Sequence, residues 1–222
     1  MQNQKTTVYY YISSRGENPV KEFLDSLEES QQAKILRIFQ HIEEYGLQAV
    51  LPHLKKVTDT PLWEIRTLGR DNIRILYIVP EKDAILALHG FIKKKQKTPR
   101  KEIDTAVDRY EAWKVLTARH HIWYHIGMEN KHLYTFEKDL QKRLRNPKFK
   151  KAWEDLEVEY TLAKQLIEAR LSKKLSQRDL AKKLRTSQAA ISRLETMRGN
   201  PSLLILKRIA HALQTKFVLP IQ

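Results

Sequence analysis

The sequence contains no cysteine among its 222 residues. Disulfide frameworks, thiolate zinc sites and cysteine nucleophiles are therefore excluded. It also has no apolar run approaching the ~20 residues that a membrane-spanning helix needs, and no signal peptide opens it. From these absences we expect a soluble, cytoplasmic protein with no membrane partner.

Acidic residues are scarce beside basic ones, since 26 Asp and Glu against 41 Lys and Arg give a net charge of +15. The excess is uneven, because residues 1–118 carry 19 basic and 16 acidic residues whereas residues 119–222 carry 22 and 10. The second part is therefore the stronger candidate for binding a polyanion. The length allows one large domain or two small ones, and this asymmetry favours two.

Residues 176–195, SQRDLAKKLRTSQAAISRLE, have the spacing of two short helices joined by a tight turn. Ser176 can cap the first helix in a capping box with Asp179, and Ser187 can cap the second. The outward positions suit a major groove, since Gln can pair with adenine, Arg with guanine and Ala with the thymine methyl. The candidate DNA-binding residues are Gln177, Ser187, Gln188, Ala189, Ser192 and Arg193.

A third helix is predicted to start at Asn200 and Pro201, with Leu206, Ile209 and Leu213 at helical spacing. From about residue 160 to residue 217 the chain resembles the XRE-type helix-turn-helix domain of phage repressors and antitoxins. The alternative is an ordinary helical hairpin with a solvated polar face. If it is a DNA-binding domain, operator binding should require a homodimer, because one helix reads only one half-site.

The first half mixes strand and helix patterns. Residues 8–12 read as a strand, and a helix follows Asn18 and Pro19. A longer helix ends at Gly46, and a last helix begins at Thr98 and Pro99. Three β-like runs separated by short turns predict an antiparallel meander between these helices. The runs are residues 62–68, 72–79 and 84–92.

Unusual charges lie on the predicted meander. Glu64 and Arg66 share one face of its first strand, and Arg74 on the next strand must reach water or a carboxylate such as Glu64. A lysine cluster, Lys93, Lys94, Lys95 and Lys97, follows the third strand. These cations could bind a phosphate backbone, and the alternative is a salt-bridged sheet face with a solvated lysine loop.

The segments LWEIRTLGRDNIRILYIV and ALHGFIKKKQKTPRKEIDTAVDR resemble the HigB-like branch of the RelE/ParE toxin superfamily, over about residues 7–113. This resemblance implies an α+β fold, with a RelE-like antiparallel sheet, N-terminal helices and a C-terminal helix. It also implies a metal-independent endoribonuclease, an mRNA interferase acting on messenger RNA at the ribosome. Some members poison gyrase instead, and the strand arginines and the lysine cluster favour the ribonuclease.

Arg66 and Arg74 match the positions where the superfamily uses basic residues on these strands. Arginine is too basic to accept a proton, so we expect both to stabilise the developing phosphate charge. Glu64, Lys56 or Lys94 could transfer protons, and the sequence does not choose among them. The candidate RNA contacts are His53, which we expect in a loop, and Lys55, Lys93 and Lys95. We expect His89 to be a packed structural histidine and Tyr77 to be core.

Residues 117–131 show neither helical nor strand periodicity and form a predicted linker after a toxin domain of residues 1–116. From about residue 128 to residue 222 the chain resembles a HigA-type antitoxin in layout, and we place the antitoxin domain at residues 132–222. We therefore interpret the chain as a toxin fused to its antitoxin, joined naturally, by loss of a stop signal or by construction. Tethering should keep the toxin inhibited by contacts within or between chains.

Two further predictions concern the joint and the antitoxin part. The segments 134–144 and 149–153 either cover the basic toxin face or pack on the toxin helices. His120, His121 and His125 lack a carboxylate or cysteine to complete a ligand set nearby, so we predict no metal site and no cofactor. The alternative function is a non-enzymatic, phage-type transcriptional repressor with an inert RelE-like module.

Overall fold

A six-stranded sheet organises the first part of the chain. The computed structural model describes residues 6–47, 50, 53–67, 71–81, 83–94, 98–120 and 133–220. The strand order is β2-β3-β4-β5-β1-β6, and every neighbouring pair is antiparallel except β1 with β5. The fold is α+β, and the predicted meander is confirmed as β3, β4 and β5. The strands are β1 (Thr7–Tyr11), β2 (Leu54–Lys56), β3 (Trp63–Arg66), β4 (Ile73–Glu81), β5 (Ala84–Ile92) and β6 (Leu133–Thr135).

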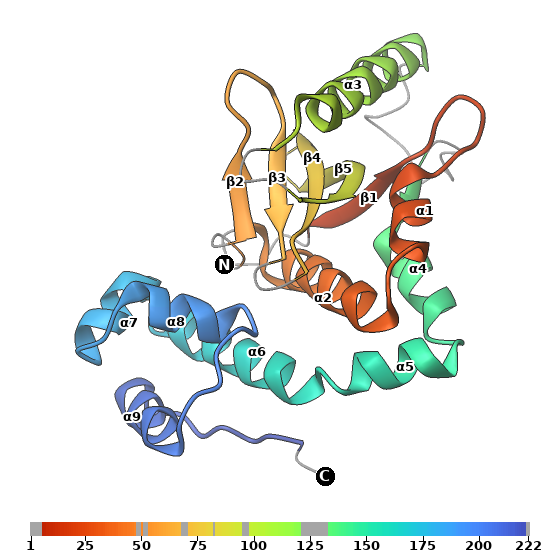
Figure 1. Cartoon of the computed structure of the whole chain (residues 1–222). Helices are drawn as coiled ribbons and strands as arrows, with labels where there is room; N and C mark the ends of the chain where they lie inside the picture. The colour runs from red at the N-terminus through yellow and green to blue at the C-terminus, as the bar shows by residue number, and fades with distance from the viewer. Residues whose placement is uncertain are drawn as a thin grey trace.

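Helices cover both faces of this sheet (Figure 1). α1 (Pro19–Asp25) and α2 (Glu29–Tyr45) share one buried cluster with the sheet, and α3 (Arg100–His120) packs on the opposite face. The predicted start of α1 and the predicted end of α2 are confirmed. Asn18 accepts a hydrogen bond from the Lys21 amide at 2.9 Å, and Gly46 ends α2 with a φ of 73°.

Strand alternation fails in β5. It predicts that His89 shares a side with Ile85 and Ala87, yet a bulge shifts the register between His89 and Ala87. Ala87 therefore faces the cluster under α1 and α2, whereas Phe91 faces the cluster under α3. His89 stacks on Phe91, with ring centroids 5.9 Å apart, and so belongs to the α3 side.

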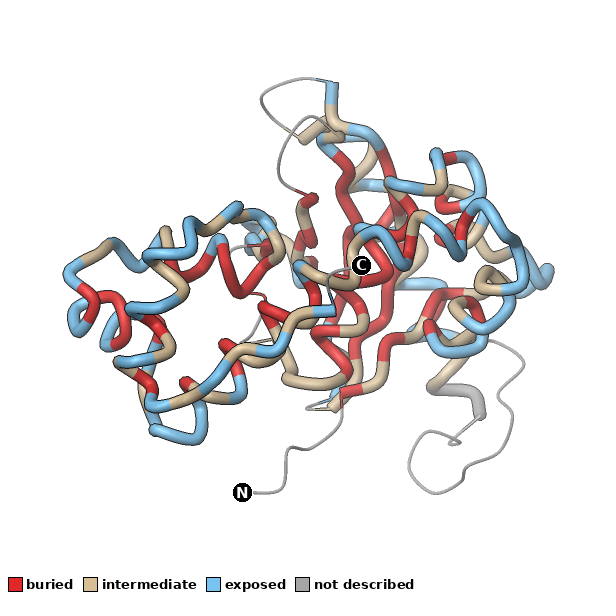
Figure 2. The backbone as a smooth tube through the Cα atoms, turned by 90° about the horizontal axis from the view of Figure 1, so that it is seen from below, coloured by how far each residue is buried: buried red, intermediate tan, exposed pale blue. Residues whose placement is uncertain are grey.

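The second half is a chain of helices that begins against the sheet and ends in a separate small core (Figure 2). The predicted turn is confirmed, since Arg185 adopts a left-handed φ of 50° between α7 and α8. The third helix of the motif begins later than predicted, because Ser202 caps it and Pro201 stays outside. The helices are α4 (Phe136–Arg143), α5 (Pro147–Glu154), α6 (Glu157–Ser172), α7 (Gln177–Lys183), α8 (Gln188–Glu195) and α9 (Leu203–Leu213).

The two halves share one hydrophobic core. Phe136, Phe149 and Trp153 of the second half are buried in the same cluster as Tyr10 and Phe39 of the first. In addition, β6 pairs with β1 and extends the toxin-like sheet, a strand that the sequence did not predict. The sequence left two alternatives for segments 134–144 and 149–153. The structure shows that they pack on the helices and the edge of the sheet and not on the basic face.

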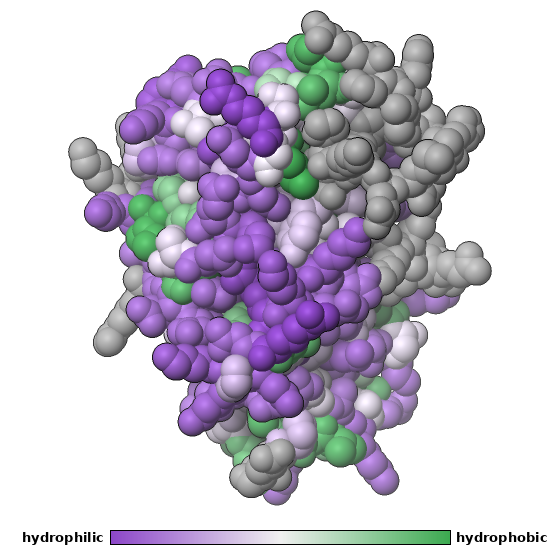
Figure 3. Space-filling model, turned by 90° about the vertical axis from the view of Figure 1, so that its right-hand side faces the viewer, coloured by the Kyte–Doolittle hydropathy of each residue, from purple (hydrophilic) through white to green (hydrophobic). Residues whose placement is uncertain are grey.

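α3 extends into the first residues of the predicted linker. Residues 117–120 belong to α3, and residues 121–131 lie outside the described residues, as do the side chain of His120 and the whole of His121 and His125. None of the described helices is long and apolar enough to cross a membrane. The face shown in Figure 3 is mainly hydrophilic, with small, separated hydrophobic groups.

Candidate nucleic-acid interfaces

Five predicted site residues converge on the sheet face that carries α3. In the strand register Arg66 lies opposite Arg74, and Glu64 lies opposite Lys55. Lys93 follows β5 and is close enough to the other four for their charges to act on it. The structure thus brings together residues from β2, β3, β4 and the end of β5, although the sequence predicted no strand at β2.

Glu64 and Arg74 form a buried ion pair at the base of this cluster. Arg74 Nε lies 3.3 Å from Glu64 Oε1, and the two residues are 7% and 2% exposed. Arg74 Nη1 also donates to the carbonyls of Thr67 and Ile73, at 3.0 and 2.8 Å, and Thr98 Oγ1 donates to Glu64 Oε2 at 2.9 Å. Burial lowers the pKa of Arg74, although the Glu64 charge opposes this shift. Glu64 is therefore held by contacts with both Arg74 and Thr98.

Arg66 and Lys93 lie nearer the surface of the same face. Arg66 is half-buried and its Nη2 donates to the Leu54 carbonyl at 3.4 Å. Burial lowers the pKa of Lys93; Glu64 opposes the shift, while the positive charges of Arg74, Lys55 and Arg66 add to it. The sequence named Lys93 only as an RNA contact. Its lowered pKa also makes it a candidate for proton transfer.

Lys56 and Lys94 are described outside this cluster. Lys56 pairs with Trp63, and its Nζ lies 5.1 Å from the Trp63 ring centroid, on the face away from Arg66. Lys94 is exposed just beyond Lys93, and Lys95 lies outside the described residues.

His53, which the sequence predicts as an RNA contact in a loop, is a buried residue in the structure. His53 directly precedes β2, is 3% exposed, and its Nδ1 lies 2.6 Å from the Arg66 carbonyl. Burial lowers its pKa to about 4, against weaker opposing effects of the Arg66 and Thr196 carbonyls. The ring is therefore neutral near pH 7 and is covered by the second half, so it presents no surface to RNA in this arrangement.

His89 is structural, as predicted, and sits in a polar network with α3. Its Nε2 lies 2.6 Å from Glu102 Oε2, and Arg109 Nη1 lies 2.8 Å from its Nδ1. Burial lowers its pKa, with Glu102 opposing. Arginine can only donate hydrogen bonds, so the His89 Nδ1 accepts from Arg109. The His89 Nε2 therefore carries the hydrogen and donates it in a hydrogen bond to Glu102. Tyr77 is fully buried in the core, also as predicted.

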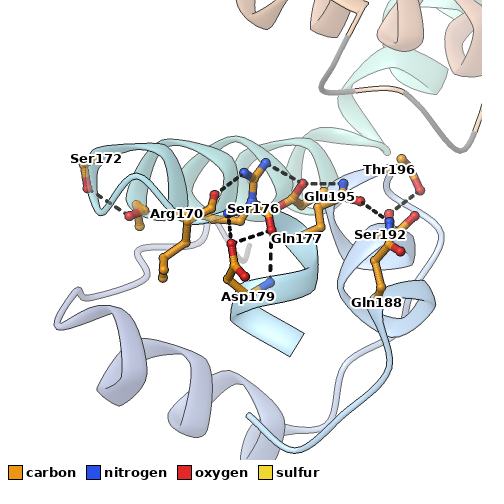
Figure 4. A network of polar contacts seen from close by, with 11 residues as sticks. Arg170, Ser172, Ser176, Gln177, Asp179, Gln188, Ser192, Glu195 and Thr196 are labelled. Atoms are coloured by element: carbon orange, nitrogen blue, oxygen red, sulfur yellow. Dashed lines mark hydrogen bonds and ion pairs between the residues drawn. The ribbon is translucent and has the colours of Figure 1, made fainter. Parts of the chain in front are cut away.

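A buried ion pair holds the helix-turn-helix motif together (Figure 4). Arg170 of α6 makes two hydrogen bonds to Glu195 of α8, Nε to Oε1 at 2.5 Å and Nη2 to Oε2 at 2.9 Å. Gln177 Nε2 donates to Glu195 Oε2 at 2.8 Å. Both predicted caps are present, because Asp179 N donates to Ser176 Oγ and Ala190 N to Ser187 Oγ, each at 3.1 Å.

Four of the six candidate DNA-binding residues are exposed on this scaffold, and two are not. Gln177 and Ser192 are 8% and 6% exposed, so they support the motif and do not face a groove. Gln177 reaches inward to Glu195, a contact between helices that residue spacing does not reveal. The exposed four are Ser187, Gln188, Ala189 and Arg193.

Arg37 is a buried polar contact between the two halves. It lies on α2, is 2% exposed, and its guanidinium carbon lies 3.9 Å from the Trp153 ring centroid and 4.3 Å from that of Tyr160. Its Nη2 also donates to the Trp153 carbonyl at 3.0 Å and to Glu157 at 2.5 Å. Burial lowers its pKa, and Glu157 opposes the shift.

A second contact brings the turn after α8 against the sheet. Arg198 in this turn lies close to Arg66 and His53, and the sequence did not identify it as a neighbour of the site. A cavity of about 280 Å³ separates the two surfaces. It is lined by Lys34, Ile38, His53, Thr67, Leu156, Thr196, Met197 and Arg198.

Comparison with protein families supports both resemblances. Residues 22–111 match the family described as Phage derived protein Gp49-like (DUF891), which is a RelE/HigB-type toxin family. Residues 166–219 match the helix-turn-helix family of XRE type. No curated protein matches the chain. The chain is thus a toxin-like domain followed by a DNA-binding helix-turn-helix domain.

Proposed function

We propose that this chain is a toxin–antitoxin fusion in which a ribosome-dependent messenger-RNA endoribonuclease of HigB type is restrained by a HigA-type half. That half would also bind operator DNA as a homodimer in the cytoplasm and repress its own promoter. The observation that best supports the nuclease is the convergence of Lys55, Arg66 and Lys93 on one sheet face, beside the Glu64–Arg74 pair.

In the proposed reaction, an internal 2′-hydroxyl attacks the adjacent phosphorus and the 5′-oxygen leaves. Arg66 would stabilise the charge on the phosphorane oxygens, because arginine stays protonated and donates several hydrogen bonds. Lys93, in its neutral form, would accept the 2′-hydroxyl proton and then return it to the leaving 5′-oxygen, since burial lowers its pKa. Arg74, held by Glu64 and two carbonyls, would position Arg66 and add positive charge from below.

The second half restrains the first without α4 or α5 covering this face. It pairs β6 with the free edge of β1, packs α5 on α2, and sets the turn after α8 beside Arg66. We infer that the inhibition is steric. The docked helix-turn-helix domain would prevent Arg66 and Lys93 from reaching RNA inside the ribosome.

A non-enzymatic repressor with an inert toxin-like module is the second candidate. It is favoured by the buried Glu64–Arg74 pair, whose polar groups already bond one another and the backbone. Such pairing leaves them little capacity to bind a substrate phosphate.

The test is to express residues 1–120 under a tight promoter while following growth and messenger-RNA 5′ ends. We expect arrest with new cleavage sites, loss of both with Arg66→Ala, and rescue by residues 121–222 supplied on a second plasmid. Arg100→Ala is the control, because Arg100 is exposed on α3 and carries the same charge.

Soluble fragment that accumulates without arrest would contradict the nuclease and leave the repressor. Solubility must be measured directly, since removing the second half uncovers the core residues that Phe136, Phe149 and Trp153 bury.

A further inference from the structure

Five cations form a row that crosses from the toxin-like sheet to the recognition helix. On the sheet face Lys55 lies opposite Glu64 and Arg66 lies opposite Arg74, and the Lys93 amide donates to the Asn72 carbonyl beside β4 at 2.9 Å. In the turn after α8 the Arg198 amide donates to the Arg193 carbonyl at 2.8 Å. Arg198 also lines a cavity with His53, whose Nδ1 lies 2.6 Å from the Arg66 carbonyl. We call Lys55, Lys93, Arg66, Arg198 and Arg193 the basic row.

The row is open to solvent along most of its length. Lys55, Arg193 and Arg198 are exposed, and Arg66 and Lys93 are half-buried. Glu64, a carboxylate of the same face, acts on Lys93 and is also held by Arg74 and Thr98. Its single negative charge, shared with Arg74, is smaller than the five positive charges of the row, and this excess favours a polyanion as the partner.

The position of α8 selects duplex DNA as that polyanion. Gln188 and Ala189 are exposed at the N-terminal end of α8, the end that enters a major groove in this motif. The other end of α8 leads into Thr196, which lies against His53 of the first half. DNA carries one negative charge per about 1.7 Å of its axis. The part of the row that adjoins the sheet therefore lies beside the helix that reads DNA in this motif, at the distal end of that helix.

We propose that the toxin-like half takes part in DNA binding, with Lys55, Arg66 and Lys93 contacting the phosphate backbone beyond the groove that α8 reads. This inference rests on the proposed operator binding. It also gives the docked arrangement a second role, because the cations that would hold RNA in the free toxin hold DNA in the fused chain.

The test measures DNA affinity of the full chain against salt concentration, using a duplex selected from a random-sequence library on the full chain. Each phosphate contact contributes about 0.9 to the slope of log K against log salt. We expect Lys55→Ala/Lys93→Ala to reduce the slope by about 1.8 and to weaken binding similarly on unrelated duplexes. The matched control is Lys148→Ala/Lys151→Ala, which removes the same charge from exposed positions on α5.

Three results would overturn the proposal, and they are distinguishable. If no duplex is selected and none binds, the proposed operator binding fails as well. If the duplex binds but both double variants have the wild-type slope, the toxin-like half makes no contact with DNA. If Lys55→Ala/Lys93→Ala loses affinity for a single-stranded RNA probe and keeps its DNA slope, the sheet part of the row serves RNA alone.

Discussion

Arg37 shows how a single buried side chain links the two halves. We predict that Arg37→Met lowers the free energy of unfolding by about 2–4 kcal/mol, because it removes two ring contacts and the bonds to Trp153 and Glu157. The carboxylate left behind is partly exposed, which keeps the loss below that of a fully buried pair. Urea denaturation of the full chain checks this. Arg145→Met, at an exposed position, should change the free energy of unfolding little. Equal losses of stability in the two variants would contradict the role of Arg37 in linking the halves.

Gly90 is required by a close approach and not by its backbone angle. A Cβ at this position would lie 2.0 Å from Phe23 Cδ1, because the β5 bulge turns residue 90 toward α1. We predict that Gly90→Ala costs about 1–3 kcal/mol of stability through overpacking. Adding Phe23→Leu should restore part of the loss, which a double-mutant cycle measures. Strictly additive losses would show that the two positions do not conflict.

At the scale of elements, the recognition helix α8 divides into exposed and supporting residues. We predict that Arg193→Ala weakens binding to a selected duplex by about 1–3 kcal/mol if it contacts guanine, whereas Ser192→Ala leaves it unchanged. Fluorescence anisotropy with selected and unrelated duplexes separates the cases. Equal losses for Arg193→Ala on both duplexes would make Arg193 a phosphate contact instead.

The elements also decide how the halves are joined. β6 adds three residues to the open edge of β1, and α5 lies along α2. An open strand edge and an apolar helix face are both unfavourable in water, so covering them ties the toxin-like fold to its partner. This arrangement leaves the face with Arg66 and Lys93 outside the contacts of α4 and α5.

At the scale of the whole molecule, two buried histidines make stability depend on pH. Burial lowers the pKa of His41 and of His53 to about 4, below the ordinary value of 6.5. His41 packs on Tyr160, and its Nδ1 lies 3.2 Å from the Arg37 carbonyl. The unfolded chain binds protons first as pH falls, so the contribution is complete above 6.5 and is lost between 6.5 and 4.

We predict that unfolding at pH 5 is easier than at pH 7 by on the order of 2 kcal/mol for each histidine. The variant His41→Asn/His53→Asn should flatten this dependence, because asparagine does not titrate. His211→Asn, at an exposed position on α9, is the control. Denaturation curves between pH 4 and 8 check the prediction, and an unchanged pH slope in the double variant would refute it.

The sequence by itself determined the features that depend on neighbours in the chain. Caps at Ser176 and Ser187, the turn at Arg185 and the strands that carry Glu64, Arg66 and Arg74 were all predicted. These features follow from hydrogen bonds and side-chain periods within a few residues, which the order of residues encodes directly. The two family resemblances have the same origin, since their motifs are local.

Only the tertiary structure decided which of these residues are accessible and what they meet. The β5 bulge moved His89 to the α3 side, Gln177 turned inward to Glu195, and the second half buried His53. The approach of Arg198 to Arg66 likewise joins residues far apart in the chain. Such contacts depend on how whole elements pack, and packing is set by the shape and charge of surfaces that local spacing does not specify.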